Sequence, residues 1–154
     1  MSHGQNGTFT NQLMPNEAQV EEMQKPGPKD DGPIVMVNLL KFKEKAEYPD
    51  GRETDLTGLQ AYQRYAVKAA ELVYKHGGQI IFAGHTSFLT LGECDPLWDE
   101  VALAYYPNRK ALFEMSISPE WKDISIHREA GLAGQLNIET APAFLPPAFV
   151  AKPA

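Results

Sequence analysis

Six side chains carry groups that could bind a ligand or take part in catalysis. They are Asn38, His85, Trp98, Glu100, His127 and Arg128. Asn38 lies in the middle of PIVMVNLLKF, residues 33–42, a stretch that is otherwise almost entirely apolar. A carboxamide in such a segment either bonds a backbone group or a buried water, or faces a pocket. Asn38 is therefore a candidate for ligand binding, with a purely structural role as the alternative.

Glu100 and Trp98 belong to a second apolar stretch, WDEVALAYY, residues 98–106. Burying a carboxylate is costly unless it is paired or hydrated. If Glu100 is enclosed, its pKa should rise and the group could act as a general base. Trp98 is expected to pack in the core or at a dimer interface, with a role as a platform for a ligand as the alternative.

Two histidines and an arginine complete the candidates. His85 falls in a predicted strand, whereas His127 and Arg128 belong to HREAG, residues 127–131. A lone histidine is usually structural or faces solvent, although either histidine could serve a functional site. The Arg128 guanidinium could bind a carboxylate through two parallel hydrogen bonds, unless Glu129 beside it neutralises the charge.

Motifs for metal, phosphate or nucleophilic chemistry are absent from the sequence. The four histidines and the single cysteine, Cys94, lie far apart, and there is no GxxxxGK, GxGxxG or GxSxG motif. Glu93 and Asp95 flank Cys94, and their negative charge disfavours a reactive thiolate. We therefore expect no metal and no cofactor.

Composition and charge narrow the class of protein further. A chain of 154 residues with 43% hydrophobic residues suits one domain with a real core. The net charge of −6 argues against binding to nucleic acid or to an anionic membrane, which needs clustered Lys and Arg. One cysteine permits no intrachain disulfide, and the polar start MSHGQNGTFT contains no signal-like or membrane-spanning stretch. These features predict a cytoplasmic protein.

Periodicity and end signals predict four strands and four helices. Capping boxes occur at Asn16 with Gln19 and at Thr57 with Gln60, and Gly77 and Gly78 should end the second helix. The predicted helices cover 16–24, 57–76, 108–115 and 118–130, and the predicted strands cover 34–42, 79–91, 98–106 and 134–140. The strand over 79–91 is expected to bend or bulge at Gly84.

After the first helix, the order strand, helix, strand, strand, helix, strand is typical of the α+β ferredoxin-like fold with an antiparallel sheet. Helices then cover only one face of the sheet, and pairing with a second copy would cover the other. We expect an N-terminal arm and short helix (1–32), a ferredoxin-like domain (33–140) and a proline-rich tail (141–154). The tail is expected to lie across the partner or the mouth of the barrel.

Alternation along the strands predicts which side chains face the helices, because successive residues point to opposite faces. One set is apolar, mostly branched and of medium size, as expected for a core packed against helices. It comprises Val35, Val37, Leu39, Val101 and Leu103. By elimination, Asn38, Trp98 and Glu100 should face the barrel interior between two copies. Tyr62 and Tyr65, in the helix over 57–76, are expected only to pack.

Several separated motifs, in order along the chain, resemble a known family. They are GPIVMVNLLKF, YPDG, GLQAYQRY, GGQIIFAG, WDEVALAYYPNRKALFEM and HREAGLAGQLNIET, which together span about residues 33–140. They resemble the family of the domain of unknown function DUF1330, within the dimeric α+β barrel superfamily. This resemblance implies a ferredoxin-like fold that dimerises through its sheets to enclose a cavity. It implies no established reaction.

Three functions remain open, and the favoured one is binding of a small organic molecule in the barrel cavity. The first alternative is an enzyme similar to the cofactor-independent monooxygenases and isomerases of this superfamily. Its least favoured variant is haem degradation, which would use Asn38, Trp98 and His127. The second alternative is a structural homodimer without a ligand, whose interior is filled by its own side chains. The candidate fillers are Met36, Phe42, Trp98 and Tyr106.

Overall fold

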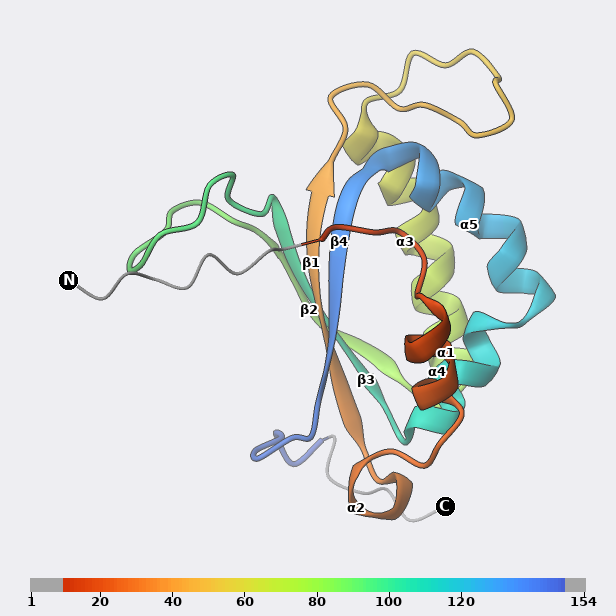
Figure 1. The fold of residues 1–154 in the computed structure, drawn as a ribbon, viewed down its shortest axis with the longest axis vertical. Coiled ribbons are helices and arrows are strands. Elements are labelled where there is room, and N and C mark those ends of the chain that lie inside the picture. The colour runs from red at the N-terminus through yellow and green to blue at the C-terminus, as the bar shows by residue number, and fades with distance from the viewer. Residues whose placement is uncertain (1–9, 149–154) are drawn as a thin grey trace.

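In the computed structural model, which describes residues 10–148, four strands form one antiparallel sheet (Figure 1). The strands are β1 (Ile34–Phe42), β2 (Gln79–His85), β3 (Glu100–Tyr106) and β4 (Leu132–Thr140). Their order across the sheet is β2–β3–β1–β4. One helical connection joins β1 to β2 and another joins β3 to β4, so the predicted ferredoxin-like α+β fold is confirmed.

The helices cover one face of this sheet (Figure 1). They are α1 (Glu17–Met23), α2 (Pro28–Asp31), α3 (Gly58–Lys75), α4 (Arg109–Ser116) and α5 (Pro119–Gly131). The long helices α3 and α5 pack side by side, and the predicted extra N-terminal helix is α1. The short α2 was not predicted, and Lys29 and Asp30 in it have φ values of 55° and 56°. This segment is therefore a left-handed turn rather than a continuous helix.

The predicted capping boxes define where two helices begin. Thr57 Oγ1 accepts a hydrogen bond from the Gln60 amide (3.1 Å), and Gln60 Oε1 accepts one from the Thr57 amide (2.9 Å). Asn16 and Gln19 make the same reciprocal pair before α1. Gly77 ends α3 at φ +85°, a conformation that glycine adopts without steric cost.

The core shows that the predicted assignment of strand faces is wrong. Ile34, Met36 and Leu40 of β1 are buried beneath the helices, so the even-numbered side chains of this strand face α3. The odd-numbered set predicted as the helix-packed core lies on the opposite face, where Val37 pairs with Ile138 of β4. Both faces of β1 are apolar, so alternation separates two sets without saying which one meets the helices. Branched side chains reflect strand preference and do not identify the helix-packed face.

β2 is shorter than predicted and ends at His85 instead of continuing to Leu91. The amide of Thr86 donates to the Asp99 carbonyl (2.9 Å), and the Thr86 hydroxyl donates to the carbonyl of Trp98. Beyond this point the chain leaves the sheet as a loop that projects on the side without helices (Figure 1). The register shift lies between Ile80 and Phe82, so the bulge expected at Gly84 is displaced towards the start of the strand.

Arg109, the first residue of α4, holds the N-terminal segment against the sheet. Its Nε and Nη2 donate to the two carboxylate oxygens of Glu139 at 2.7 Å each. Its Nη1 donates to the carbonyls of Glu22, Lys25 and Pro26 at 3.1–3.3 Å. One guanidinium thus joins β4 to the chain between α1 and α2.

The sheet face opposite the helices carries exposed apolar side chains. Phe82 is 53% exposed and Ile138 is 46% exposed. Residues 141–148 form no helix or strand, and the rest of the proline-rich tail, like the first part of the N-terminal arm, lies outside the described residues. Within residues 10–148, no helix combines the length and apolar character needed to cross a membrane.

Candidate ligand pocket

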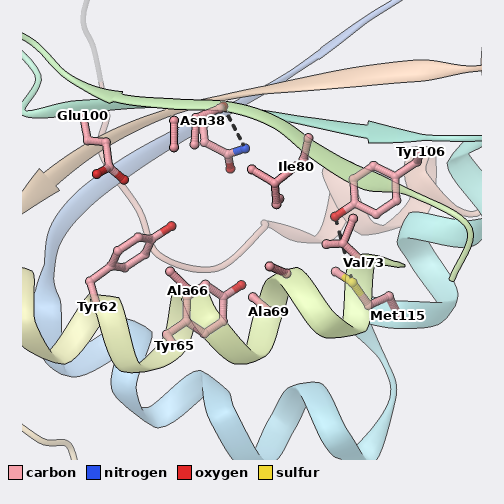
Figure 2. A pocket seen from close by; sticks show the side chains of 14 residues that line it. Asn38, Tyr62, Tyr65, Ala66, Ala69, Val73, Ile80, Glu100, Tyr106 and Met115 are labelled. Atoms are coloured by element: carbon pink, nitrogen blue, oxygen red, sulfur yellow. Dashed lines mark hydrogen bonds between the residues drawn. The ribbon is translucent and has the colours of Figure 1, made fainter. Parts of the chain in front are cut away.

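A cavity of about 180 Å³ lies between α3 and the sheet, within a single chain (Figure 2). Six of its lining residues are alanines, three from α3 and three from β2 and β3. They are Ala66, Ala69, Ala70, Ala83, Ala102 and Ala104. The other lining residues are Asn38, Tyr62, Tyr65, Val73, Ile80, Glu100, Tyr106 and Met115.

The alanines explain why this space is open. Protein interiors are normally close-packed, so a void needs a local shortage of side-chain volume. Ala66, Ala69 and Ala70 recur on one face of α3 at helical spacing, and they lie opposite Ala102 and Ala104 of β3. Larger lining side chains keep the helix and sheet apart, and the short methyl groups leave the gap between them unfilled.

Three phenols supply hydrogen-bonding groups to this cavity. Burial raises the pKa of Tyr62, Tyr65 and Tyr106, so all three are neutral at physiological pH. Tyr65 Oη accepts a hydrogen bond from the Trp121 indole (3.1 Å), and the Tyr106 hydroxyl makes a long contact of 3.9 Å to Met115 Sδ. The Tyr62 hydroxyl makes no hydrogen bond to any of residues 10–148 and is available to a ligand.

Glu100 occupies the end of the cavity opposite Tyr106 (Figure 2). Its side chain is 14% exposed, and Oε1 lies 3.6 Å from Nδ1 of His85, which is 59% exposed at the edge of the sheet. Burial raises the pKa of the Glu100 carboxyl, and the nearby His85 partly opposes that rise. The carboxyl is therefore more readily protonated than an exposed glutamate.

Asn38 projects into the cavity from β1, near the middle of the sheet (Figure 2). Its Oδ1 accepts a hydrogen bond from Nε2 of Gln135 (2.8 Å). Its Nδ2 makes only long contacts, 3.4 Å to the Met36 carbonyl and 3.3 Å to the Ala102 carbonyl. The amide oxygen is thus well satisfied, whereas both N–H groups of the amide nitrogen are held only by long hydrogen bonds.

The six predicted residues divide into those at the cavity and those away from it. Asn38 and Glu100 line it, and His85 contacts Glu100 at its edge. Arg128 does not line the cavity, but its Nη2 donates to Gln135 Oε1 at 2.7 Å, and Gln135 in turn contacts Asn38.

Trp98 and His127 are not among the lining residues. His127 Nδ1 lies 2.8 Å from the Tyr48 hydroxyl, and burial lowers the pKa of this imidazole, with Arg52 and Arg64 adding to the effect. The expectation that Asn38 and Glu100 face the interior between two copies is corrected, because both face α3 of their own chain. This is the consequence of the inverted faces described above.

The alanines and phenols of the cavity were not predicted as site residues. Tyr62 and Tyr65 were expected only to pack, and alanines on a helix face resemble ordinary helix packing. A usable signal was present, since the face of α3 that carries the tyrosines continues into three alanines. Within residues 10–148, no group of three or more His, Cys, Asp or Glu side chains is placed to bind a metal ion.

The fold and the cavity define a ferredoxin-like α+β domain with an internal pocket between its first long helix and its sheet. The family described as "Domain of unknown function (DUF1330)" matches residues 52–139, which is more than half of the chain. The protein belongs to this family, and the resemblance inferred from the sequence motifs is confirmed.

Solved structures agree with this membership. The methylated RPA0582 protein is 31% identical, with a TM-score of 0.76 over 90% of this chain and 98% of its own. RPA0582 of Rhodopseudomonas palustris, a protein of unknown function, is 27% identical, with a TM-score of 0.76 over 88% and 100%. An uncharacterised NIPSNAP-like domain protein of Burkholderia xenovorans, 18% identical with a TM-score of 0.50 over 76% and 91%, shares the fold alone. Among curated proteins, none matches the chain.

Proposed function

We propose that this protein binds a small, largely apolar organic molecule in the cavity between α3 and the sheet. The observation that carries the proposal is a cavity of about 180 Å³ with six alanines in its lining, on which Asn38, Glu100 and three phenols converge. Apolar pockets with a few convergent polar groups are the usual form of small-molecule sites. Such groups orient a ligand while the methyl-lined walls accept its apolar part.

The electrostatics of the cavity support binding more than acid–base catalysis. Its four titratable side chains are Tyr62, Tyr65, Glu100 and Tyr106, and burial raises the pKa of each. A catalytic acid–base pair usually has pKa values that its surroundings push apart. Here all four groups shift towards their neutral forms, which favours a hydrogen-bonding pocket over a proton-transfer site.

The alternatives gain less from the structure. Of the three residues on which the haem-degrading variant depended, only Asn38 lines the cavity. For the structural homodimer, two of the candidate fillers, Met36 and Tyr106, are buried beneath the helices. Open space remains beside Tyr106, so these side chains do not complete the packing.

Ligand-dependent changes in amide NMR spectra test the proposal. Toluene and indole, as small apolar probes, should shift resonances of α3 and β3 in the wild-type protein. Ala69→Leu fills part of the cavity and should abolish these shifts, whereas Val67→Leu, on the exposed face of the same helix, should preserve them. The proposal fails if neither probe perturbs these resonances, or if Ala69→Leu binds them as well as wild type.

We also propose that a second copy of the chain covers the helix-free face of the sheet. Phe82 and Ile138 are exposed on this face, and the loop between β2 and β3 presents Leu91, which is 90% exposed. An apolar sheet face beside a projecting apolar loop is suited to self-association. Sedimentation analysis should find a dimer for wild type and for Val67→Lys, and a monomer for Ile138→Lys. A wild-type monomer at micromolar concentration would refute the dimer.

A further inference from the structure

Arg128 is buried, with only 9% of its surface exposed, and its close partners are neutral. Its Nε and Nη2 donate to Gln135 Oε1 at 3.1 Å and 2.7 Å, and Nη2 also donates to the Leu13 carbonyl at 2.7 Å. Its Nη1 is buried without a hydrogen-bond partner among residues 10–148. The cost of burying this charge is not offset by pairing to a carboxylate, so its two hydrogen bonds to Gln135 call for a physical reason.

That contact determines which way two amides point. A guanidinium can only donate hydrogen bonds, so Gln135 must direct its oxygen towards Arg128. The nitrogen of Gln135 then faces Asn38, and it donates to Asn38 Oδ1 at 2.8 Å. With its oxygen facing Gln135, Asn38 presents its donor nitrogen on the cavity side, where its two present hydrogen bonds, to the Met36 and Ala102 carbonyls, are long. Arg128 thus acts on the cavity through Gln135, without lining it.

We propose that Arg128 and Gln135 are positioning residues that make the cavity a hydrogen-bond-donating site, selective for ligands with a carbonyl or carboxylate oxygen. This inference rests on the proposed function and specifies the ligand class. The present acceptors of Asn38 Nδ2 lie at 3.3 Å and 3.4 Å, longer than the roughly 2.9 Å of an ordinary N–H···O bond. A ligand oxygen at the ordinary distance would therefore replace one of these long bonds with a better one.

Tyr62 supplies a second donor from the opposite wall. Figure 2 shows its hydroxyl and the Asn38 amide directed into the same cavity from α3 and β1. A ligand oxygen between them would receive two hydrogen bonds, while its apolar part would lie along the alanines towards Val73 and Ile80. Glu100 is the competing feature, because an ionised carboxylate would instead attract an amine.

Gln135→Glu tests the orientation of the amides directly. Both oxygens of the new carboxylate accept hydrogen bonds, so the contact with Arg128 is retained. Asn38 now faces an acceptor and must turn its nitrogen towards position 135, away from the cavity. In wild type, the Asn38 side-chain amide protons should show nuclear Overhauser effects to Ala102. In Gln135→Glu these should weaken and be replaced by effects to the side chain at position 135. Gln63→Glu, the same substitution at an exposed position of α3, should leave the wild-type pattern unchanged. An unaltered pattern in Gln135→Glu would show that Gln135 does not orient the Asn38 amide, and would overturn the inference.

Binding of three probes of similar size tests the selectivity. Acetophenone accepts hydrogen bonds through its carbonyl oxygen. Toluene neither accepts nor donates hydrogen bonds, and benzylamine is a cationic donor. Wild type and Gln63→Glu should bind acetophenone about tenfold more tightly than toluene, the amount expected for one hydrogen bond in the cavity. In Gln135→Glu this ratio should fall to about one. If Gln135 had only a structural role, Gln135→Glu would weaken the binding of acetophenone and toluene equally and leave the ratio of their affinities unchanged.

The remaining outcomes separate this inference from the proposed function. If toluene binds as tightly as acetophenone in wild type, the cavity binds ligands but the inferred selectivity is wrong. If benzylamine binds most tightly, Glu100 rather than Asn38 determines recognition, and the inference is again overturned. If none of the probes binds, the selectivity falls together with the proposed function.

Discussion

Filling the cavity should stabilise the protein, and Ala69→Leu is the substitution that tests this. Ala69 is 7% exposed and lines the cavity from α3. Leucine adds three carbons, and burying them contributes about 2.4 kcal/mol at ~0.8 kcal/mol per methylene. Fixing the new side chain costs about 0.5–1 kcal/mol of rotamer entropy. The net gain of about 1.5 kcal/mol corresponds to a rise in Tm of roughly 3–6 °C for a chain of this size.

Urea unfolding followed by circular dichroism measures this gain. The unfolding free energy of Ala69→Leu should rise while the m-value stays constant, because the surface exposed on unfolding changes little. The matched control Val67→Leu, at an exposed site on the same helix, should change stability by less than about 0.5 kcal/mol. A loss of about 1–3 kcal/mol in Ala69→Leu would be the signature of overpacking. That result would refute the reasoning, because the space would then be unable to accept additional atoms.

Two further substitutions address a titrating group and the N-terminal segment. Glu100→Gln should remove a pH dependence: because the folded-state pKa of Glu100 is raised, wild type loses stability as pH rises from the unfolded pKa, about 4.3, through the folded value. Unfolding titrations should therefore show that the unfolding free energy of the variant, relative to that of wild type, is higher at pH 7 than at pH 4. The same difference at both pH values would contradict this. Arg109→Met leaves Glu139 unpaired and should cost about 2–4 kcal/mol, with faster hydrogen exchange in residues 16–32. Unchanged exchange there would show that Arg109 does not anchor the segment.

The sequence was sufficient to predict the fold because its local signals agree with one another. The capping pairs of Asn16 and Thr57 and the glycine after α3 each occur where a helix begins or ends. β2 was predicted too long because apolar character continues beyond His85. A strand needs a neighbour, however, and β3 begins only at Glu100, so residues beyond Thr86 have no strand beside them.

The site was predicted only in part, for reasons that the strands make clear. Asn38 and Glu100 stood out because polar side chains are rare in buried strands, and both line the cavity. The face that they occupy could not be derived from the sequence, because β1 is apolar on both sides. One side packs against the helices and the other belongs to the surface proposed for dimerisation, and the two give the same alternation of residues. Gln135 was missed because its role depends on contacts with Arg128 and Asn38 that no local spacing reveals.

The alanine walls make the pocket unusually easy to remodel. Each of the six alanines presents a single methyl group on a helix or strand whose backbone is fixed elsewhere, by caps, by sheet pairing and by the larger core side chains. Exchanging one alanine for serine, valine or leucine would therefore change the outline or polarity of the space without moving the scaffold. A fold built in this way can diversify its choice of small molecules through a few substitutions while its architecture stays the same.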